Sequence, residues 1–420
     1  MKKILFTSLS PNAEKDDVFR ALCLLFKPWK WNRGAYIQKV NDWLGDYSGY
    51  ENVFLTESGR TGLLLALQSL KIGEGDEVLV QAYTCVAVPN SVLWTKAKPV
   101  FVDIDGATLN ISLEDARSKV TDKTKAIVVQ HTFGNPADME RVMEFAREFG
   151  LLVIEDCAHG LGAEFNGKTL GSFGDASIFS FGRDKVVSAV FGGAVAVKDA
   201  EAAQRLSDLY EDLPMVGNVW TIKQLLHPII FSVAKLLYGI GPIGKIIIEL
   251  SKKGGLIAKA VYPEERCAGK PGFTSHKLNN VLAELAYFQL LKLPKFLENR
   301  RRLGALYDEE LSGLNLVTQK SLSGALSGYL RYFLSVADPD GLLSYAKSEG
   351  VLLGDWYRQA IAPKGVVYEK IGYEKGSCPN AEAQAERSVN LPTHIGITEN
   401  DALRITKLVK SFYDKNTRDK

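Results

Sequence analysis

Two stretches of sequence decide the fold: VIEDCAH at residues 153–159 and SIFSFGRDK at residues 177–185. Each contains a short apolar run of the kind that forms a buried strand, and each ends in charged or polar side chains. In open α/β sheets, ligands bind at the carboxyl ends of the strands. Asp156 and Lys185 therefore both fall where such a sheet would hold a ligand.

Further short apolar runs resemble these two and alternate with helical stretches. Together the predicted strands are 53–56, 77–81, 99–103, 126–130, 151–155, 176–181 and 193–197. Short β-branched runs separated by helices are typical of a mostly parallel sheet that is covered on both faces. The sequence thus predicts an α/β fold with a mostly parallel, seven-stranded sheet.

The bulk composition is that of a globular enzyme. The 420 residues are 46% hydrophobic and 24% charged, and a net charge of +2 gives no reason to expect nucleic acid as a partner. The five cysteines include no Cys-x-x-Cys pair, which disfavours a zinc site or a disulfide framework and favours a reducing cytoplasm. We expect neither a signal peptide nor a membrane span.

The length predicts two domains. We expect residues 1–260 to form an N-terminal arm and a large domain that carries the sheet. Residues 261–420 are expected to hold a long connecting helix over 276–311 and a smaller C-terminal α/β domain. The segment 219–260 differs from the rest, because its apolar clusters are interrupted by proline and glycine and punctuated by lysines.

Two interpretations of the 219–260 segment stay open. In the first, the segment covers the ligand site or a subunit interface. In the second, it lies as an amphipathic segment at a membrane surface. Membrane-surface contact through this segment is therefore one of the partner hypotheses that the sequence raises.

Lys185 and Asp156 have complementary chemistry. A lysine held at a strand exit can form a Schiff base with an aldehyde if its site lowers its pKa. A carboxylate that faces a pyridine nitrogen keeps that nitrogen protonated, so that the ring can accept electrons. Together the two residues suggest pyridoxal phosphate (PLP), although each taken alone is more typical of an ordinary strand end. Glu155 is expected to point away, because side chains alternate along a strand.

The turn Ser58-Gly59-Arg60 lies between a strand and a helix, where backbone amides can hold a phosphate. Such turns are also common as plain helix caps. Ser180 is positioned to add a hydroxyl to the same phosphate. His159 lies three residues after Asp156. It either bonds a phenolic oxygen of the ligand or is a structural histidine. His131 either contacts the substrate or only packs in the core.

In combination, these residues resemble the DegT/StrS-type sugar aminotransferases, a branch of the type I, aspartate-aminotransferase-like PLP fold. The resemblance covers roughly residues 34–412 and depends on five blocks in a specific order. The blocks are 58–61 with 75–78, 99–105, 155–163, 171–194, and 378–382 with 390–392.

The resemblance implies a role for each candidate. Lys185 would be the Schiff-base lysine, Asp156 the partner of the pyridinium nitrogen and His159 the neighbour of the phenolic oxygen. The implied phosphate-binding residues are Ser58, Gly59, Arg60 and Ser180.

The chain also departs from the family pattern. Arg60 replaces a threonine, which would add a charge-assisted contact to the phosphate. Cys85 stands where an aromatic ring often covers the cofactor, so either Tyr83 takes over or the stack is missing. Ser275 stands where a partner subunit lends an asparagine to the phosphate, and Lys277 stands where arginine is common. The resemblance implies a homodimer with shared active sites.

The function implied is a PLP-dependent aminotransferase that moves an amino group from an amino acid, with glutamate as the expected donor, to a keto-sugar. By analogy, the sugar would be nucleotide-linked and belong to cell-surface polysaccharide or secondary-metabolite biosynthesis. One alternative is a PLP-dependent sugar dehydratase or other lyase, although dehydrating relatives carry histidine in place of Lys185. Another is a membrane-surface or regulatory protein with a lipid-linked substrate or none.

Overall fold

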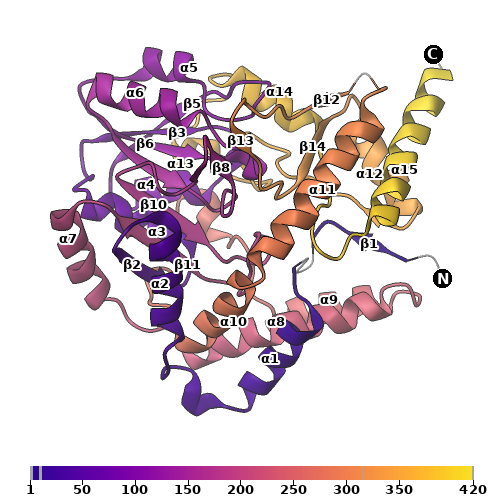
Figure 1. Cartoon of the computed structure of the whole chain (residues 1–420), viewed down its shortest axis with the longest axis horizontal. Coiled ribbons are helices and arrows are strands. Elements are labelled where there is room, and N and C mark those ends of the chain that lie inside the picture. The colour runs from indigo at the N-terminus through magenta and orange to yellow at the C-terminus, as the bar shows by residue number, and fades with distance from the viewer. Residues whose placement is uncertain (1–2, 9–11, 315, 419–420) are drawn as a thin grey trace.

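A seven-stranded sheet lies at the centre of the computed structural model, which describes residues 3–8, 12–314 and 316–418 (Figure 1). The strand order is β2-β11-β10-β7-β6-β3-β5, and β11 runs antiparallel to both its neighbours while the other pairs are parallel. The mostly parallel α/β sheet predicted from the sequence is confirmed. Its strands are β2 (Asn52–Thr56), β3 (Glu77–Gln81), β5 (Lys98–Val102), β6 (Thr124–Gln130), β7 (Leu152–Asp156), β10 (Ala176–Ser180) and β11 (Gly193–Val197).

Apolar cores lie on both faces of this sheet, which explains why its strands are continuous apolar runs. In β6, Ile127 and Val129 belong to one core, whereas Ala126 and Val128 belong to the other. Helix α3 (Gly59–Ser69) packs on β10 and β11 and so places its N-terminus beside the end of β10.

A second, antiparallel sheet is built by the last third of the chain, in the order β12 (Val317–Thr318), β14 (Tyr332–Ser335) and β17 (Ser388–Leu391). Helices α11 (Leu293–Leu311), α12 (Pro339–Ser348) and α15 (Glu399–Arg418) contribute to one core with it. Strand β1 (Leu5–Phe6) pairs with β15 (Val351–Leu352), so the N-terminal arm joins this C-terminal part.

The helical region expected over 276–311 is two helices rather than one. Helix α10 (Asn280–Leu290) ends just before α11 begins at Leu293. Pro294 lies in the first turn of α11, where a missing amide hydrogen is tolerated but the preceding helix cannot continue through it. Helix α10 packs on α2 (Tyr36–Ser48), and α11 passes from the core of the large sheet to the C-terminal core.

The 219–260 segment forms a helical hairpin of α8 (Asn218–Leu237) and α9 (Ile243–Lys253). Helix α1 (Lys15–Leu25) packs on α8, and α8 packs on α9, so that the three lie together along one edge (Figure 1). Among the residues that the structure describes, no helix combines the length and apolar character needed to cross a membrane.

Candidate active site

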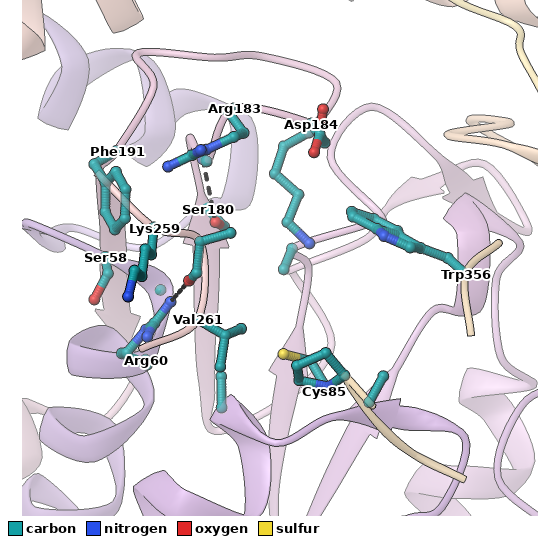
Figure 2. A pocket seen from close by; sticks show the side chains of 18 of the residues that line it. Ser58, Arg60, Cys85, Ser180, Arg183, Asp184, Phe191, Lys259, Val261 and Trp356 are labelled. Atoms are coloured by element: carbon teal, nitrogen blue, oxygen red, sulfur yellow. Dashed lines mark hydrogen bonds between the residues drawn. The ribbon is translucent and has the colours of Figure 1, made fainter. Parts of the chain in front are cut away.

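A cavity of about 720 Å3 opens where several strands of the large sheet end (Figure 2). Strands β6, β7 and β10 end at Gln130, Asp156 and Ser180, and all three residues line the cavity. Its size is typical of a site for a small molecule or cofactor. Of the ten predicted site residues, the eight that line it are Ser58, Gly59, Arg60, Cys85, Asp156, His159, Ser180 and Lys185.

Asp156, the last residue of β7, is 5% exposed and accepts a hydrogen bond from the amide of Ala158 at 2.9 Å. Glu155 points to the other side of the sheet, where backbone amides within residues 171–174 donate to its carboxylate. Burial raises the pKa of Asp156, while the bond from Ala158 and the charge of Lys185 oppose that rise. A cationic ligand atom beside this carboxylate would compensate its burial.

Lys185 lies in the loop that follows β10, and its amide donates to the carbonyl of Gly182 at 3.0 Å. Burial lowers the pKa of Lys185, and the nearby charge of Asp156 opposes this shift. Its Nζ atom lies 5.6 Å from the centre of the Trp356 ring. A lowered pKa increases the share of neutral amine, which is the form that attacks an aldehyde.

Asn12 of the N-terminal arm holds this loop in place. Its Nδ2 donates to the carbonyl oxygens of Lys185 and Val186, to the latter at 2.9 Å. Its Oδ1 accepts a hydrogen bond from Nη2 of Arg300 at 3.0 Å, and both side chains are buried. No motif in the sequence marks Asn12, because its partners are far away along the chain.

Replacing Asn12 with alanine is expected to lower both stability and catalytic rate. The substitution leaves a guanidinium nitrogen of Arg300 and two loop carbonyls without their partner, at a cost of about 2–4 kcal/mol. Because Lys185 is then less well positioned, we expect kcat to fall by about tenfold or more. Thermal unfolding and steady-state kinetics measure the two effects, with Asn32→Ala, at an exposed position, as the control. Unchanged kcat would show that the loop does not need this support.

The turn before α3 has the features of a phosphate site. Ser58 is the N-cap, and its Oγ accepts a hydrogen bond from the amide of Thr61 at 3.4 Å. The first amides of a helix have no partner within the helix and attract anions. At Gly193 a Cβ atom would lie 2.4 Å from the amide nitrogen of Gly59, and at Gly59 it would lie 3.2 Å from Cβ of Ser180. The glycines thus let the helix N-terminus and the Ser180 hydroxyl approach the same point.

Arg60 is paired within the chain. Its Nη1 bonds to the carboxylate of Glu265, and its Nη2 donates to the carbonyl of Ala260 at 2.8 Å (Figure 2). The segment after α9 is thereby fastened to the turn, and Lys259 and Val261 from this segment line the cavity. The guanidinium of Arg60, which we expected to contact only a phosphate, is thus also paired with the carboxylate of Glu265. Nothing in the sequence indicates this partner.

Glu57 is a second residue that sequence reasoning missed. Its fully buried carboxylate accepts hydrogen bonds from the hydroxyls of Ser58 and Thr61, at 2.8 and 2.6 Å, and from the amide of His276 at 3.1 Å. Burial raises the pKa of Glu57 to about 7, although these hydrogen bonds act in the opposite direction. Glu57 thus joins the turn to the segment that precedes α10.

The pH dependence of stability is expected to show the titration of Glu57. Since its pKa is higher in the folded chain than in the unfolded one, the folded state binds this proton more tightly. Stability from this group is complete at low pH and is lost as pH rises from about 4.5 to about 7, a loss of about 3 kcal/mol. The free energy of unfolding, measured with urea at a series of pH values across this range, should fall less steeply with pH in Glu57→Gln than in the wild type. In Glu51→Gln it should fall as steeply as in the wild type. The same pH dependence of the free energy of unfolding in all three proteins would contradict the attribution of this titration to Glu57.

The aromatic lining of the cavity comes from Trp356, Tyr357, Phe191 and Phe231, not from Tyr83. Tyr83 is completely buried, its hydroxyl donates to Oγ of Ser388 at 2.9 Å, and its ring packs edge-on against Tyr357. The structure thus places Tyr83 outside the cavity, which does not favour the first of the two alternatives, a Tyr83 ring that covers the cofactor. Cys85 does line the cavity, and burial raises the pKa of its thiol. No role for Trp356 was predicted from the sequence.

His159 is buried in the cavity wall with a defined tautomer. Its Nδ1 accepts a hydrogen bond from the amide of Phe133 at 3.3 Å, which leaves the proton on Nε2. Nε2 lies 3.3 Å from the hydroxyl oxygen of Tyr357. Burial lowers the pKa of His159 well below its usual range, so the ring is neutral. A neutral donor at this position is suited to a phenolic oxygen.

His131 and Ser275 do not line the cavity. His131 is completely buried, accepts a hydrogen bond from the amide of Ala137 at 3.2 Å and lies 3.5 Å from Glu155, which favours packing over substrate contact. The amide of Ser275 donates to Oγ1 of Thr61 at 3.0 Å. Ser275 therefore lies behind the phosphate turn of its own chain.

Comparison with known proteins agrees with this geometry. A sequence model of the DegT/DnrJ/EryC1/StrS aminotransferase family matches residues 13–219 and 244–410. The chain belongs to this family. It is an aminotransferase, and the resemblance described from the sequence is confirmed. The matched residues leave out 220–243, which contain most of α8.

Individual relatives have low sequence identity to this chain, but they align with most of its length. GDP-perosamine synthase of Vibrio cholerae is 26% identical over 92% of this chain and 93% of its own length. UDP-N-acetyl-3-dehydro-alpha-D-glucosamine 3-aminotransferase of Acidithiobacillus ferrooxidans is 29% identical over 84% and 82%. The crystal structure of the aminotransferase TlmJ from Streptoalloteichus hindustanus superposes with a TM-score of 0.75 at 24% identity, over 98% of this chain and 99% of that one. The fold is therefore that of this family.

Proposed function

We propose that this aminotransferase uses PLP to move an amino group from an amino acid, with glutamate as the expected donor, to a nucleotide-linked keto-sugar. The observation that carries the proposal is the pair of buried Asp156 and partly buried Lys185 in one cavity, beside the N-terminus of α3. The names of the two relatives, one for GDP-perosamine and one for a UDP-linked dehydro-sugar, support a sugar acceptor.

The residues of the cavity fit the groups of PLP. A buried carboxylate suits a protonated ring nitrogen, and a lysine with a lowered pKa suits an aldehyde. The turn at Ser58 and the hydroxyl of Ser180 suit the phosphate. When bound there, PLP supplies an aldehyde that captures amines and a ring that takes up the electrons of the bond that breaks.

The chain itself then moves one proton and holds another. Nζ of Lys185, once neutral, would move a proton from the α-carbon of the amino donor to the cofactor, and in the second half of the reaction from the cofactor to the acceptor carbon that gains the amino group. The carboxylate of Asp156 stabilises a proton on the ring nitrogen by its charge. The Ser58 turn orients the reacting groups, which removes much of the entropic cost of bringing them together.

Basic side chains dominate the cavity lining, which favours an anionic acceptor such as a nucleoside diphosphate sugar. Figure 2 has Arg60, Arg183 and Lys259 together on one side, with Asp184 on the other. The acidic lining residues are Asp156, Asp184 and Asp355, and the basic ones are Arg60, Arg183, Lys185, Lys252, Lys259, Arg266, Arg358 and Lys364.

Two measurements test this function. The absorbance of PLP bound to the purified protein should change when glutamate is added, and a coupled assay should detect 2-oxoglutarate. A panel of nucleotide-linked keto-sugars should then restore the first spectrum and gain an amino group. Absence of bound PLP, or of any spectral response to amino acids, would reject the proposal. A lyase would consume the sugar without releasing 2-oxoglutarate.

The proposal includes a homodimer. Ser275 contacts the phosphate turn through Thr61, so a second subunit approaching this region would lie close to the cavity. Sedimentation analysis of the purified protein tests the dimer, and a monomer that is fully active would contradict it.

A further inference from the structure

Exposed apolar side chains are concentrated on three helices along one edge of the molecule (Figure 1). Of the eighteen large apolar side chains that are exposed in the described part of the chain, thirteen belong to this edge. Four lie between residues 19 and 29, and nine lie between residues 219 and 256. We call this surface, formed by α1, α8, α9 and their adjoining residues, the apolar edge. Clusters of this kind on a protein surface mark interaction sites.

Helix α9 is apolar on two sides. Ile248 is buried against α8 in a small core with Phe231. On another side Ile243, Ile246 and Leu250, with exposed fractions of 43%, 48% and 63%, recur at the spacing that puts residues on one helical face. A helix that only covered a core would be polar on that outer side. The outer stripe of α9 is therefore a candidate contact surface for a partner.

The other two elements extend the same surface. On α1, Phe19, Leu22 and Phe26 are also spaced to share one face, with exposed fractions of 66%, 41% and 73%. Leu236 is 78% exposed at the end of α8, and the loop 238–242 that connects it to α9 contains no charged residue. The apolar edge therefore includes an uncharged tip between the two helices of the hairpin.

Positive charge flanks these apolar residues. Between residues 218 and 260 the chain has six lysines and one acidic residue, Glu249. Lys245, Lys252 and Lys253 are exposed on α9. Helical spacing puts Lys253 beside the apolar stripe, while Lys252 also lines the cavity. An apolar face bordered by lysines is the pattern of a helix that lies at a bilayer interface and is attracted by anionic lipids.

We propose that the apolar edge docks the enzyme on the surface of a membrane that contains anionic phospholipids, with α1 and the α8–α9 hairpin lying in the interface. The helices are not suited to spanning the bilayer. A second copy of the chain fits this surface less well, because protein interfaces are depleted in lysine. The family model leaves out residues 220–243, so most of α8 lies outside the matched region, whereas α1 and nearly all of α9 lie within it.

Docking would keep the cavity close to the lipid headgroups. Phe231 of α8 lines the cavity. Leu236 of the exposed tip follows five residues later on the same helix, a distance of about 7.5 Å along its axis. Lys259, also in the cavity lining, lies six residues after the last residue of α9. The hairpin thus connects the docking surface with the active site.

Vesicle flotation tests the proposal directly. The full-length protein should float with phosphatidylcholine vesicles that contain phosphatidylglycerol, and much less with phosphatidylcholine alone or at high salt. The variant Leu236→Glu/Ile243→Glu/Leu250→Glu should lose about a hundredfold in vesicle affinity, since three apolar contacts are replaced by charges. The variant Lys245→Glu/Lys253→Glu should lose about tenfold or more, because each lysine near an anionic surface contributes to binding.

Matched controls separate docking from folding and from catalysis. Val317→Glu/Leu326→Glu/Leu403→Glu adds the same charges at exposed apolar positions elsewhere, and Lys370→Glu/Lys375→Glu reverses two exposed lysines elsewhere. Both should bind vesicles like the wild type, and so should Lys185→Ala, because docking does not require amino transfer. The proposal is wrong if the wild type does not bind anionic vesicles, or if the triple apolar-edge variant binds these vesicles as well as the wild type does. It is equally wrong if that variant dissociates an oligomer without changing vesicle binding. The apolar edge would then be the interface with a second copy of the chain.

Discussion

Replacing Lys185 with alanine is expected to lower kcat/KM for amino transfer by about ten-thousand-fold, the effect of losing a positioned proton-transfer group. Nothing else in the described chain duplicates its environment, a partly buried amine whose pKa is lowered and whose loop is held by Asn12. Single-turnover assays with glutamate and steady-state assays with a keto-sugar both measure the loss. The free energy of unfolding should not fall, because an amine whose pKa is lowered in the folded chain does not favour the folded state.

Lys185→Arg is the matched control for charge. Arginine keeps a positive charge beside Asp156, but it does not lose its proton at any pH at which the protein is folded. If Lys185 works only by attracting an anion, the arginine variant stays active. If it works as a nucleophile and base, both variants are inactive. Borohydride reduction in the presence of PLP should attach the cofactor covalently to the wild type at Lys185 and to neither variant, as peptide mass mapping would show.

Much of the sheet could be predicted because its strands are short apolar runs with obvious boundaries. The predicted limits of β3 and β11 coincide with those observed. Asp156 and Lys185 were also identifiable, since each follows such a run and the carboxyl ends of parallel strands meet at one edge. The periodicity of 276–311 was equally clear, but it concealed the break at Pro294, where two helices follow each other with almost no loop.

Contacts between distant segments could not be predicted in this way. Arg60 was expected to face a phosphate, but it bonds Glu265, which lies 205 residues away along the chain. Tyr83 was a plausible cover for a cofactor ring, but the fold turns it into the core and brings Trp356 to the cavity instead. A single sequence records side-chain chemistry and local periodicity, whereas these pairings depend on how segments that are distant along the chain pack together.

Replacing Asp156 with asparagine is expected to lower kcat by about a thousandfold. The amide preserves the shape of the side chain and can still accept the hydrogen bond from Ala158. It cannot stabilise a proton on a ring nitrogen, and the loss of one well-placed electrostatic group typically costs a factor of this size. Pre-steady-state measurement of proton removal from the α-carbon of glutamate tests this step directly. An asparagine variant with wild-type kcat would exclude Asp156 from the role of ring partner.

Stability gives an independent test of the same residue. Burial raises the pKa of Asp156 in the folded chain. The contribution of this group to the free energy of unfolding therefore falls as pH rises through that pKa. At neutral pH and without PLP, Asp156→Asn should therefore have a melting temperature equal to or higher than that of the wild type. Adding PLP should reverse this order, since a ligand that binds better to the wild type stabilises it more. If PLP instead raised both melting temperatures equally, the carboxylate would not contact the charged ring, whatever its effect on rate.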